Sequence, residues 1–400
     1  MKTRALAFCL WYLACLTINQ KSFAQDSRTQ YPKLLLHAYY EVNLGSIRYP
    51  FSVKQLEPEF SVESINIPHT AVRLVLFGYQ FNKNLAAQIT YMRPVLWVGY
   101  KNVNGDKEDH AVFMNIAGLT LKAQLPVKNK FSVYSEGGLG VITRSGFEVD
   151  HKIAVKDAGY TTYLVGGGLK YRLNNKFDLV AGATYTPAND KQKQPYTLFY
   201  SGGFTYHMQP VPEYKVKENA HSAYIFPKHL LQVGYTTNIL GYGVNNFVSE
   251  GKIPIFWGGK AQVEKGIAVQ YQQNVFHTRK VFSLDWGASA AYYKSKNVKN
   301  DFFTLSLFPT VRFTALRLQP LDVYFNYTAA GPTFISRTRI EGFKTGKNFT
   351  FYDFMGMGIY SGRKRNLNAE LRIAHYSNGN LYSENAGVKI PLTINLGYAF

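Results

Sequence analysis

The chain after residue 25 consists of a long series of short segments in which apolar and polar residues alternate. Each segment spans about ten to fifteen residues, and clusters of Asn, Gly, Lys and Asp separate one segment from the next. Clear examples run from Phe282 to Tyr292 and from Phe303 to Phe313. Because successive side chains of a strand point to opposite faces, each segment has one apolar face. No apolar run here reaches the ~20 residues of a membrane-spanning helix. A long series of such segments is typical of an antiparallel transmembrane β-barrel, an all-β fold.

The C-terminal segment distinguishes a membrane barrel from a water-soluble β-sandwich, which shows the same alternation. Its alternate residues predict an unbroken apolar face that ends on an aromatic residue: Val388, Ile390, Leu392, Ile394, Leu396, Tyr398 and Phe400. This ending resembles the closing strand of bacterial outer-membrane barrels, whose terminal Phe is read by the assembly machinery. The resemblance implies a membrane barrel, with that machinery as a partner through Phe400.

The strand count divides the chain into two units of eight. We expect one barrel over 25–208, a linker over 209–229 and a second barrel over 230–400. The linker contains Pro210, Pro212 and Pro227, and proline interrupts strand ladders. A single barrel of sixteen strands also fits the count, since both numbers are even.

The first 24 residues resemble a secretory signal peptide. Lys2 and Arg4 precede a short apolar run, and Ser22-Phe23-Ala24 offers small residues for cleavage. We therefore expect export to the outer membrane. Both cysteines, Cys9 and Cys15, lie in this segment, so a mature chain would have no disulfide, no thiolate nucleophile and no Cys-ligated metal.

The chain is basic, with a formal net charge of +20, or +17 without Lys2, Arg4 and Lys21. An exported protein rarely meets nucleic acid, so we expect no nucleic-acid partner. The charge fits anionic head groups of outer-membrane lipid, including the phosphates of lipopolysaccharide. Basic loops that only keep the chain soluble during export are an alternative.

One short motif near the C-terminus could support catalysis. His375 and Ser377 are two residues apart, so in a strand they lie on the same face as Leu371 and Ile373, which the barrel pattern turns toward lipid. A neutral imidazole can take the proton of a hydroxyl and activate it as a nucleophile. A polar strand end at the membrane interface is the alternative. An acidic loop cluster, from Asp106 to His110, offers side chains that could contact a cation, but we favour a solvated extracellular loop.

The motif extends to His375-Tyr376-Ser377-Asn378, followed by Asn385-Ala386-Gly387 and the closing strand. This pattern resembles the lipid A 3-O-deacylase family of eight-stranded outer-membrane barrels, and the resemblance covers about 226–400. Further upstream it includes Ala330-Gly331-Pro332, Phe349-Thr350-Phe351 and Gly356-Met357-Gly358. The first half resembles only a generic small outer-membrane barrel.

The resemblance implies hydrolysis of an acyl ester of lipid A without a cofactor. It implies that Ser377 is the nucleophile, His375 the general base and Asn378 part of the oxyanion hole. The family also places an acidic residue after the Asn-x-Gly element, where this chain has Lys389. Glu384 in the preceding loop is a possible substitute, whereas Glu370 is expected to point into the barrel. Two hypotheses follow: a lipid A esterase, or a structural, adhesive or porin-like barrel without catalysis.

Overall fold

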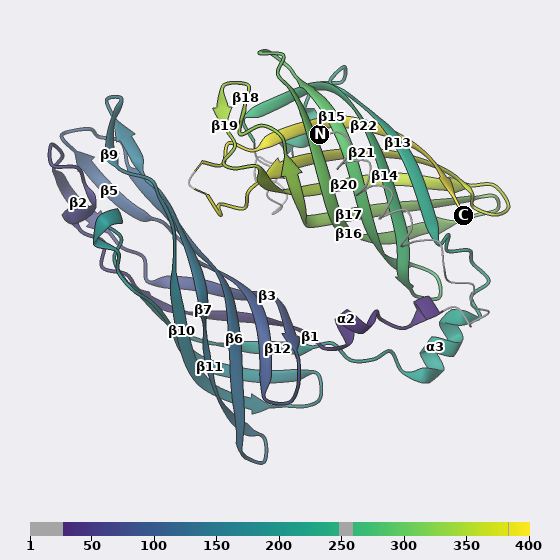
Figure 1. The fold of residues 1–400 in the computed structure, drawn as a ribbon, viewed down its shortest axis with the longest axis horizontal. Coiled ribbons are helices and arrows are strands. Elements are labelled where there is room, and N and C mark those ends of the chain that lie inside the picture. Colours follow the sequence, from purple (N-terminus) through teal and green to yellow (C-terminus); the bar gives the residue numbers. More distant parts are fainter. Residues whose placement is uncertain (1–26, 248–258, 383) are drawn as a thin grey trace, which may run out of the picture.

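A computed structural model describes residues 27–247, 259–382 and 384–400, which form two closed eight-stranded antiparallel barrels (Figure 1). The prediction of two tandem barrels is confirmed, and the alternative of one sixteen-stranded barrel is wrong, because each half closes on itself. The expected signal peptide and its cysteines lie outside the described residues. No helix in these ranges has the length and apolar character needed to cross a membrane.

The first barrel closes through pairing of β6 with β7, and a two-stranded extension, β2 with β5, continues from β6. Its eight wall strands are β1 (Ala38–Arg48), β3 (Thr70–Gln80), β4 (Leu85–Pro94), β6 (His110–Lys128), β7 (Phe131–Ser145), β10 (Ala158–Arg172), β11 (Phe177–Thr186) and β12 (Thr197–His207). Outside the wall lie β2 (Val62–Asn66), β5 (Val98–Val103), β8 (Phe147–Val149) and β9 (Lys152–Val155).

The second barrel closes through pairing of β13 with β22. Its eight strands are β13 (His229–Thr237), β14 (Ala261–His277), β15 (Phe282–Ser295), β16 (Asp301–Arg317), β17 (Leu321–Ile335), β20 (Phe349–Ser361), β21 (Leu367–Ser377) and β22 (Val388–Ala399). A small hairpin, β18 (Arg339–Ile340) and β19 (Phe343–Lys344), lies in the loop between β17 and β20.

The helical elements are short. They are η1 (Ser27–Thr29), α2 (Lys33–Leu36), η2 (Val53–Gln55), η3 (Asp190–Gln192), α3 (Glu213–Ala220) and α4 (Gly243–Phe247). Of these, α3 lies between the two barrels along the chain, and α4 follows β13.

Loop lengths give each barrel its orientation in the membrane. In the second barrel, short turns over 278–281, 318–320 and 362–366 lie at one end, whereas longer loops over 336–348 and 378–387 lie at the other. Outer-membrane barrels have short periplasmic turns and longer extracellular loops. The end of β21 that carries His375 and Ser377 is therefore the extracellular end.

Side chains fill the interior of the second barrel. Glu370 points inward, as expected, and accepts hydrogen bonds from Tyr324 Oη (2.8 Å), Asn326 Nδ2 (2.8 Å) and Arg372 Nε (2.7 Å). Arg372 Nη1 also donates to Gln270 Oε1 (2.6 Å). Large aromatic rings fit because glycines face them: a Cβ on Gly287 would lie 2.2 Å from the Phe308 ring. An eight-stranded barrel packed in this way has no room for an aqueous channel.

This buried network gives a stability prediction. Glu370→Ala leaves the Arg372 guanidinium without its carboxylate in a site that is 2 % exposed, which we expect to cost ~3–5 kcal/mol of unfolding free energy. Urea titration of the refolded chain in detergent, followed by tryptophan fluorescence, measures the loss. The control is Glu264→Ala, which removes an exposed partner of Lys299 (2.8 Å) and should cost less than ~1 kcal/mol. Equal losses of unfolding free energy in the two variants would contradict the inference that the buried Glu370 carboxylate stabilises the barrel.

The expected unbroken apolar face of the closing strand is wrong at its extracellular end. Arg372 pairs with Thr393 but Ala374 pairs with Ile390, so β22 contains one extra residue around Pro391. Proline has no N–H for the ladder and is commonly found at such bulges. Since the side-chain period is two, the extra residue reverses the facing of everything beyond it. Val388 and Ile390 are therefore buried in the core, and Lys389 faces outward.

Candidate active site

His375 and Ser377 lie on the outer wall of the second barrel. The residue between them, Tyr376, points inward, where its ring stacks on Tyr352 at 4.9 Å and its hydroxyl hydrogen-bonds Thr304 Oγ1 at 3.0 Å. Strand alternation then turns His375 and Ser377 to the opposite face. Their predicted orientation agrees with this geometry, but His375 is only 2 % exposed. The imidazole is therefore buried among protein groups and is not open to lipid.

A carboxylate that the sequence analysis missed lies directly beside the histidine. Asp353 on β20 pairs across the ladder with His375, and its Oδ2 is 3.6 Å from His375 Nδ1. A signal was present in the sequence, because Asp353 is the one charged residue on the outward face of β20. The other residues of this face are Phe349, Phe351, Met355, Met357, Ile359 and Ser361. A charge on a lipid-facing row is costly and marks a candidate functional residue.

Local backbone geometry fixes this carboxylate. The pairing of β17 with β20 shifts between Thr328 and Gly331, and within this bulge Ala330 adopts a positive φ of 56°. The Ala330 N–H donates a hydrogen bond to Asp353 Oδ1. Bulges are found next to active sites because they redirect groups that a regular ladder would use. Here the bulge supplies a donor that orients Asp353.

Lys389 occupies the other side of the histidine. The bulge in β22 places it opposite His375 in the ladder, on the same outward face. Its Nζ donates to Asn246 Oδ1 (2.8 Å) on α4, a helix that contacts β21. Asp353, His375 and Lys389 thus form a row across β20, β21 and β22.

Asn378 follows the pair and is fully buried. Its side-chain amide donates to the carbonyls of Glu384 (2.6 Å) and Thr345 (3.3 Å), and its backbone N–H donates to Asn385 Oδ1 (2.9 Å). Asn378 therefore forms hydrogen bonds with both long loops beside Ser377, the one over 336–348 and the one over 378–387. A role in the oxyanion hole would require one of these amide bonds to be exchanged for substrate.

The proposed substitute acid lies elsewhere. The Glu384 carboxylate forms an ion pair with Lys344 in the extracellular loops. Within the described ranges, no group of His, Cys, Asp and Glu side chains is arranged to hold a metal ion. In the acidic loop cluster of the first barrel, Asp106 instead pairs with His110 at 2.9 Å.

His375 and Ser377 lie at the level of an aromatic band. Ser377 pairs with Phe351, whose ring contacts that of Phe349 at 5.2 Å. On the neighbouring strands Phe303 and Phe334, both 45 % exposed, contact each other at 5.8 Å. Outward aromatic residues mark the membrane–water interface in outer-membrane barrels. The pair is therefore located where lipid head groups meet their acyl chains.

Comparison with known proteins assigns a family relationship to each half. Residues 265–399 match the family model described as Lipid A 3-O-deacylase (PagL). The C-terminal barrel is similar to the lipid A 3-O-deacylases. Residues 56–210 match the OmpA-like transmembrane domain. The resemblance inferred from the His-x-Ser-Asn motif is thereby confirmed, and both halves match families of outer-membrane barrels.

Solved structures also resemble the chain. The outer-membrane enzyme PagL is 15 % identical over 42 % of this chain and 97 % of its own, with a TM-score of 0.32. Neisserial surface protein A is 13 % identical over 43 % and 97 %, with a TM-score of 0.27. The N-terminal barrel domain of Pseudomonas aeruginosa OprF is 15 % identical over 42 % and 98 %, with a TM-score of 0.26. Sequence identities and TM-scores this low do not support an argument about function. No curated protein matches the chain significantly.

Proposed function

We propose that this protein is an outer-membrane serine esterase that removes an ester-linked acyl chain from lipid A. The observation that carries the proposal is the placement of Asp353, His375 and Ser377 together on the outer wall at the extracellular end. The match of residues 265–399 to the Lipid A 3-O-deacylase (PagL) family supports the same substrate class.

In this proposal each of the three side chains has its own role. With Nδ1 directed at Asp353, the tautomer that carries its proton on Nδ1 leaves the Nε2 lone pair to accept the Ser377 hydroxyl proton. Ser377 Oγ then attacks the ester carbonyl and releases the sugar hydroxyl, to which His375 returns the proton. Water hydrolyses the acyl-enzyme by the same route. The 3.6 Å separation of Asp353 and His375 exceeds a hydrogen bond, and such contacts often tighten only when substrate binds.

The surroundings suit an anionic glycolipid. An ester at the aromatic band lies at the depth of the catalytic pair, so the lipid need not leave the outer leaflet. Lys347, near the Tyr382 ring, and Lys389 provide cations at this end of the barrel. Ammonium groups in such positions attract lipid phosphates.

Mass spectrometry of lipid A tests the proposal. Purified, refolded full-length chain is incubated with lipopolysaccharide in mixed micelles, and the lipid A is released and weighed. We expect a product lighter by one hydroxyacyl group. Unchanged lipid A, with the barrels shown to be folded by circular dichroism, would reject the esterase and leave a non-catalytic membrane protein.

A further inference from the structure

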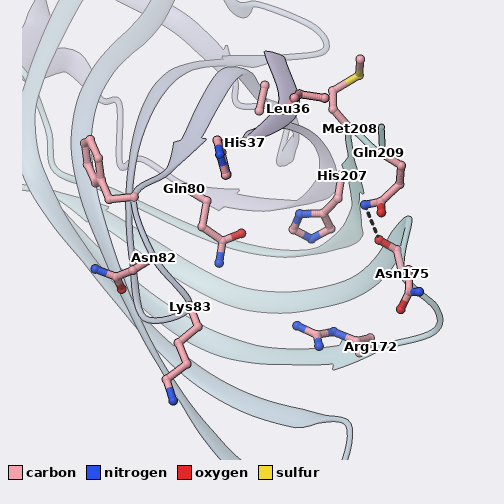
Figure 2. Close-up of a pocket in the computed structure, with 12 residues that line it drawn as sticks. Leu36, His37, Gln80, Asn82, Lys83, Arg172, Asn175, His207, Met208 and Gln209 are labelled. Atoms are coloured by element: carbon pink, nitrogen blue, oxygen red, sulfur yellow. Dashed lines mark hydrogen bonds between the residues drawn. The ribbon is translucent and has the colours of Figure 1, made fainter. Parts of the chain in front are cut away.

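The end of the first barrel with the short turns over 81–84, 129–130 and 173–176 is its periplasmic end by the same criterion of loop length. This end opens into a cavity that lies outside the proposed esterase site. It has a volume of about 430 Å³ and is lined by the start of β1, two turns and the end of β12. Figure 2 shows Gln80, Asn82 and Lys83 on one side of the opening and His207, Arg172 and Asn175 on the other. The Gln209 amide donates to the Asn175 carbonyl (2.8 Å) and holds this part of the rim.

The short turns at this end of the barrel carry charge of one sign. The strand ends and turns over 80–85, 128–131 and 172–177, all within the described part of the chain, carry five cations and no carboxylate. The cations are Lys83, Lys128, Lys130, Arg172 and Lys176. The extracellular loops differ, because there Glu57 pairs with Lys156 (2.7 Å) and Lys193 (2.9 Å). The periplasmic mouth therefore presents a positive field.

The carboxylate beneath the cavity does not cancel this field. Asp178 is fully buried, accepts a hydrogen bond from His207 Nε2 (2.6 Å) and forms an ion pair with Lys170 Nζ (3.2 Å). Arg172 Nε lies 3.8 Å from the same carboxylate, and the Arg172 side chain remains 59 % exposed. Asp178 thus orients the guanidinium while leaving it accessible from the cavity.

We propose that this mouth binds a phosphate group presented from the periplasm. The guanidinium of Arg172 matches phosphate oxygens in a planar fork, and Lys83 adds a second point charge. The amides of Gln80 and Asn82 can contact the polar body of the ligand. The volume lies at the lower end of the ~300–1,000 Å³ typical of small-molecule sites, which suits a head group or a small ester. The phosphate could come from a soluble phosphate ester or from an inner-leaflet phospholipid.

Calorimetry with sn-glycerol 3-phosphate tests the site. The full chain is refolded in a zwitterionic detergent and titrated with this probe, with acetate as a comparison anion. We expect saturable binding of the phosphate ester and at least tenfold weaker binding of acetate. Lys83→Gln and Arg172→Gln should each weaken glycerol phosphate about tenfold, in keeping with loss of one charged hydrogen bond.

Lys130→Gln is the matched control, because Lys130 lies on the third turn of the same end and does not line the cavity. It should bind the probe within twofold of the unaltered chain. An equal loss in Lys130→Gln and Arg172→Gln would overturn the site in favour of diffuse attraction. Circular dichroism of every variant confirms that the barrels are folded.

A second arm distinguishes the two sources of phosphate. The chain is reconstituted in vesicles of phosphatidylcholine and phosphatidylglycerol and then extracted for native mass spectrometry. Retained phosphatidylglycerol that disappears in the Lys83→Gln, Arg172→Gln double variant supports a lipid head group. Binding of glycerol phosphate without retained lipid supports a soluble ester. The absence of both would overturn the proposal.

Discussion

Ser377→Ala and His375→Ala are each expected to lower the turnover of acyl release by about 10⁴- to 10⁶-fold, the range found when a serine hydrolase loses its nucleophile or base. The proton of the Ser377 hydroxyl has to leave as the Oγ–acyl bond forms, so neither group replaces the other. The rate is measured from released hydroxy fatty acid with lipopolysaccharide in micelles. The double variant should be no slower than either single variant, because the two side chains act as one unit.

Ser361→Ala is the control for this pair. Ser361 ends β20 at the periplasmic end of the same barrel, so it shares the membrane environment and lies far along the wall from the motif. Its replacement should leave turnover within twofold. A Ser377→Ala variant that retained more than about a tenth of the activity would contradict the proposed nucleophile.

Asp353→Asn is expected to lower turnover by ~10²- to 10⁴-fold with a smaller change in KM. The amide is nearly isosteric, but it can donate a hydrogen bond to Nδ1 and favour the wrong tautomer, and it cannot stabilise the imidazolium. Comparing kcat and KM separates this effect from lost binding. Asp353→Glu should recover part of the rate, because a carboxylate remains on the same side of His375.

Lys389, on the other side of His375 from Asp353, provides a sharper test. Lys389 pairs with His375 on the other side of the row, and the related family has its acidic residue at this place in the sequence. We expect Asp353→Asn combined with Lys389→Glu to be at least tenfold faster than Asp353→Asn alone. Lys389→Gln in the same background is the control for loss of the cation. Equal rates in these two double variants would mean that no carboxylate beside His375 is needed.

The sequence was sufficient for the fold class because each strand carries its own pattern. A period of two, turn residues between segments and an aromatic end are local properties, and a closed barrel satisfies every backbone hydrogen bond within the membrane. The choice between two barrels and one depended on which distant strands pair. The pairing of β1 with β12 and of β13 with β22 decides it.

Local alternation along a strand also explains why the sequence predicted only part of the candidate site. His375 and Ser377 are neighbours within one strand, so their shared face follows from alternation alone. Asp353 is 22 residues earlier, and only the register of β20 against β21 brings it beside His375. The predicted facing of Val388 and Ile390 was also wrong, because a bulge at Pro391 reverses the alternation there.

The sequence by itself therefore determined the barrel class, the tandem strand count and the His-x-Ser-Asn motif with its outward orientation. Tertiary structure alone decided how the barrels close, which carboxylate faces the histidine and where cations gather around a cavity. The physical reason is that strand alternation acts over two residues, whereas register and bulges are set by hydrogen bonds between segments far apart in the chain.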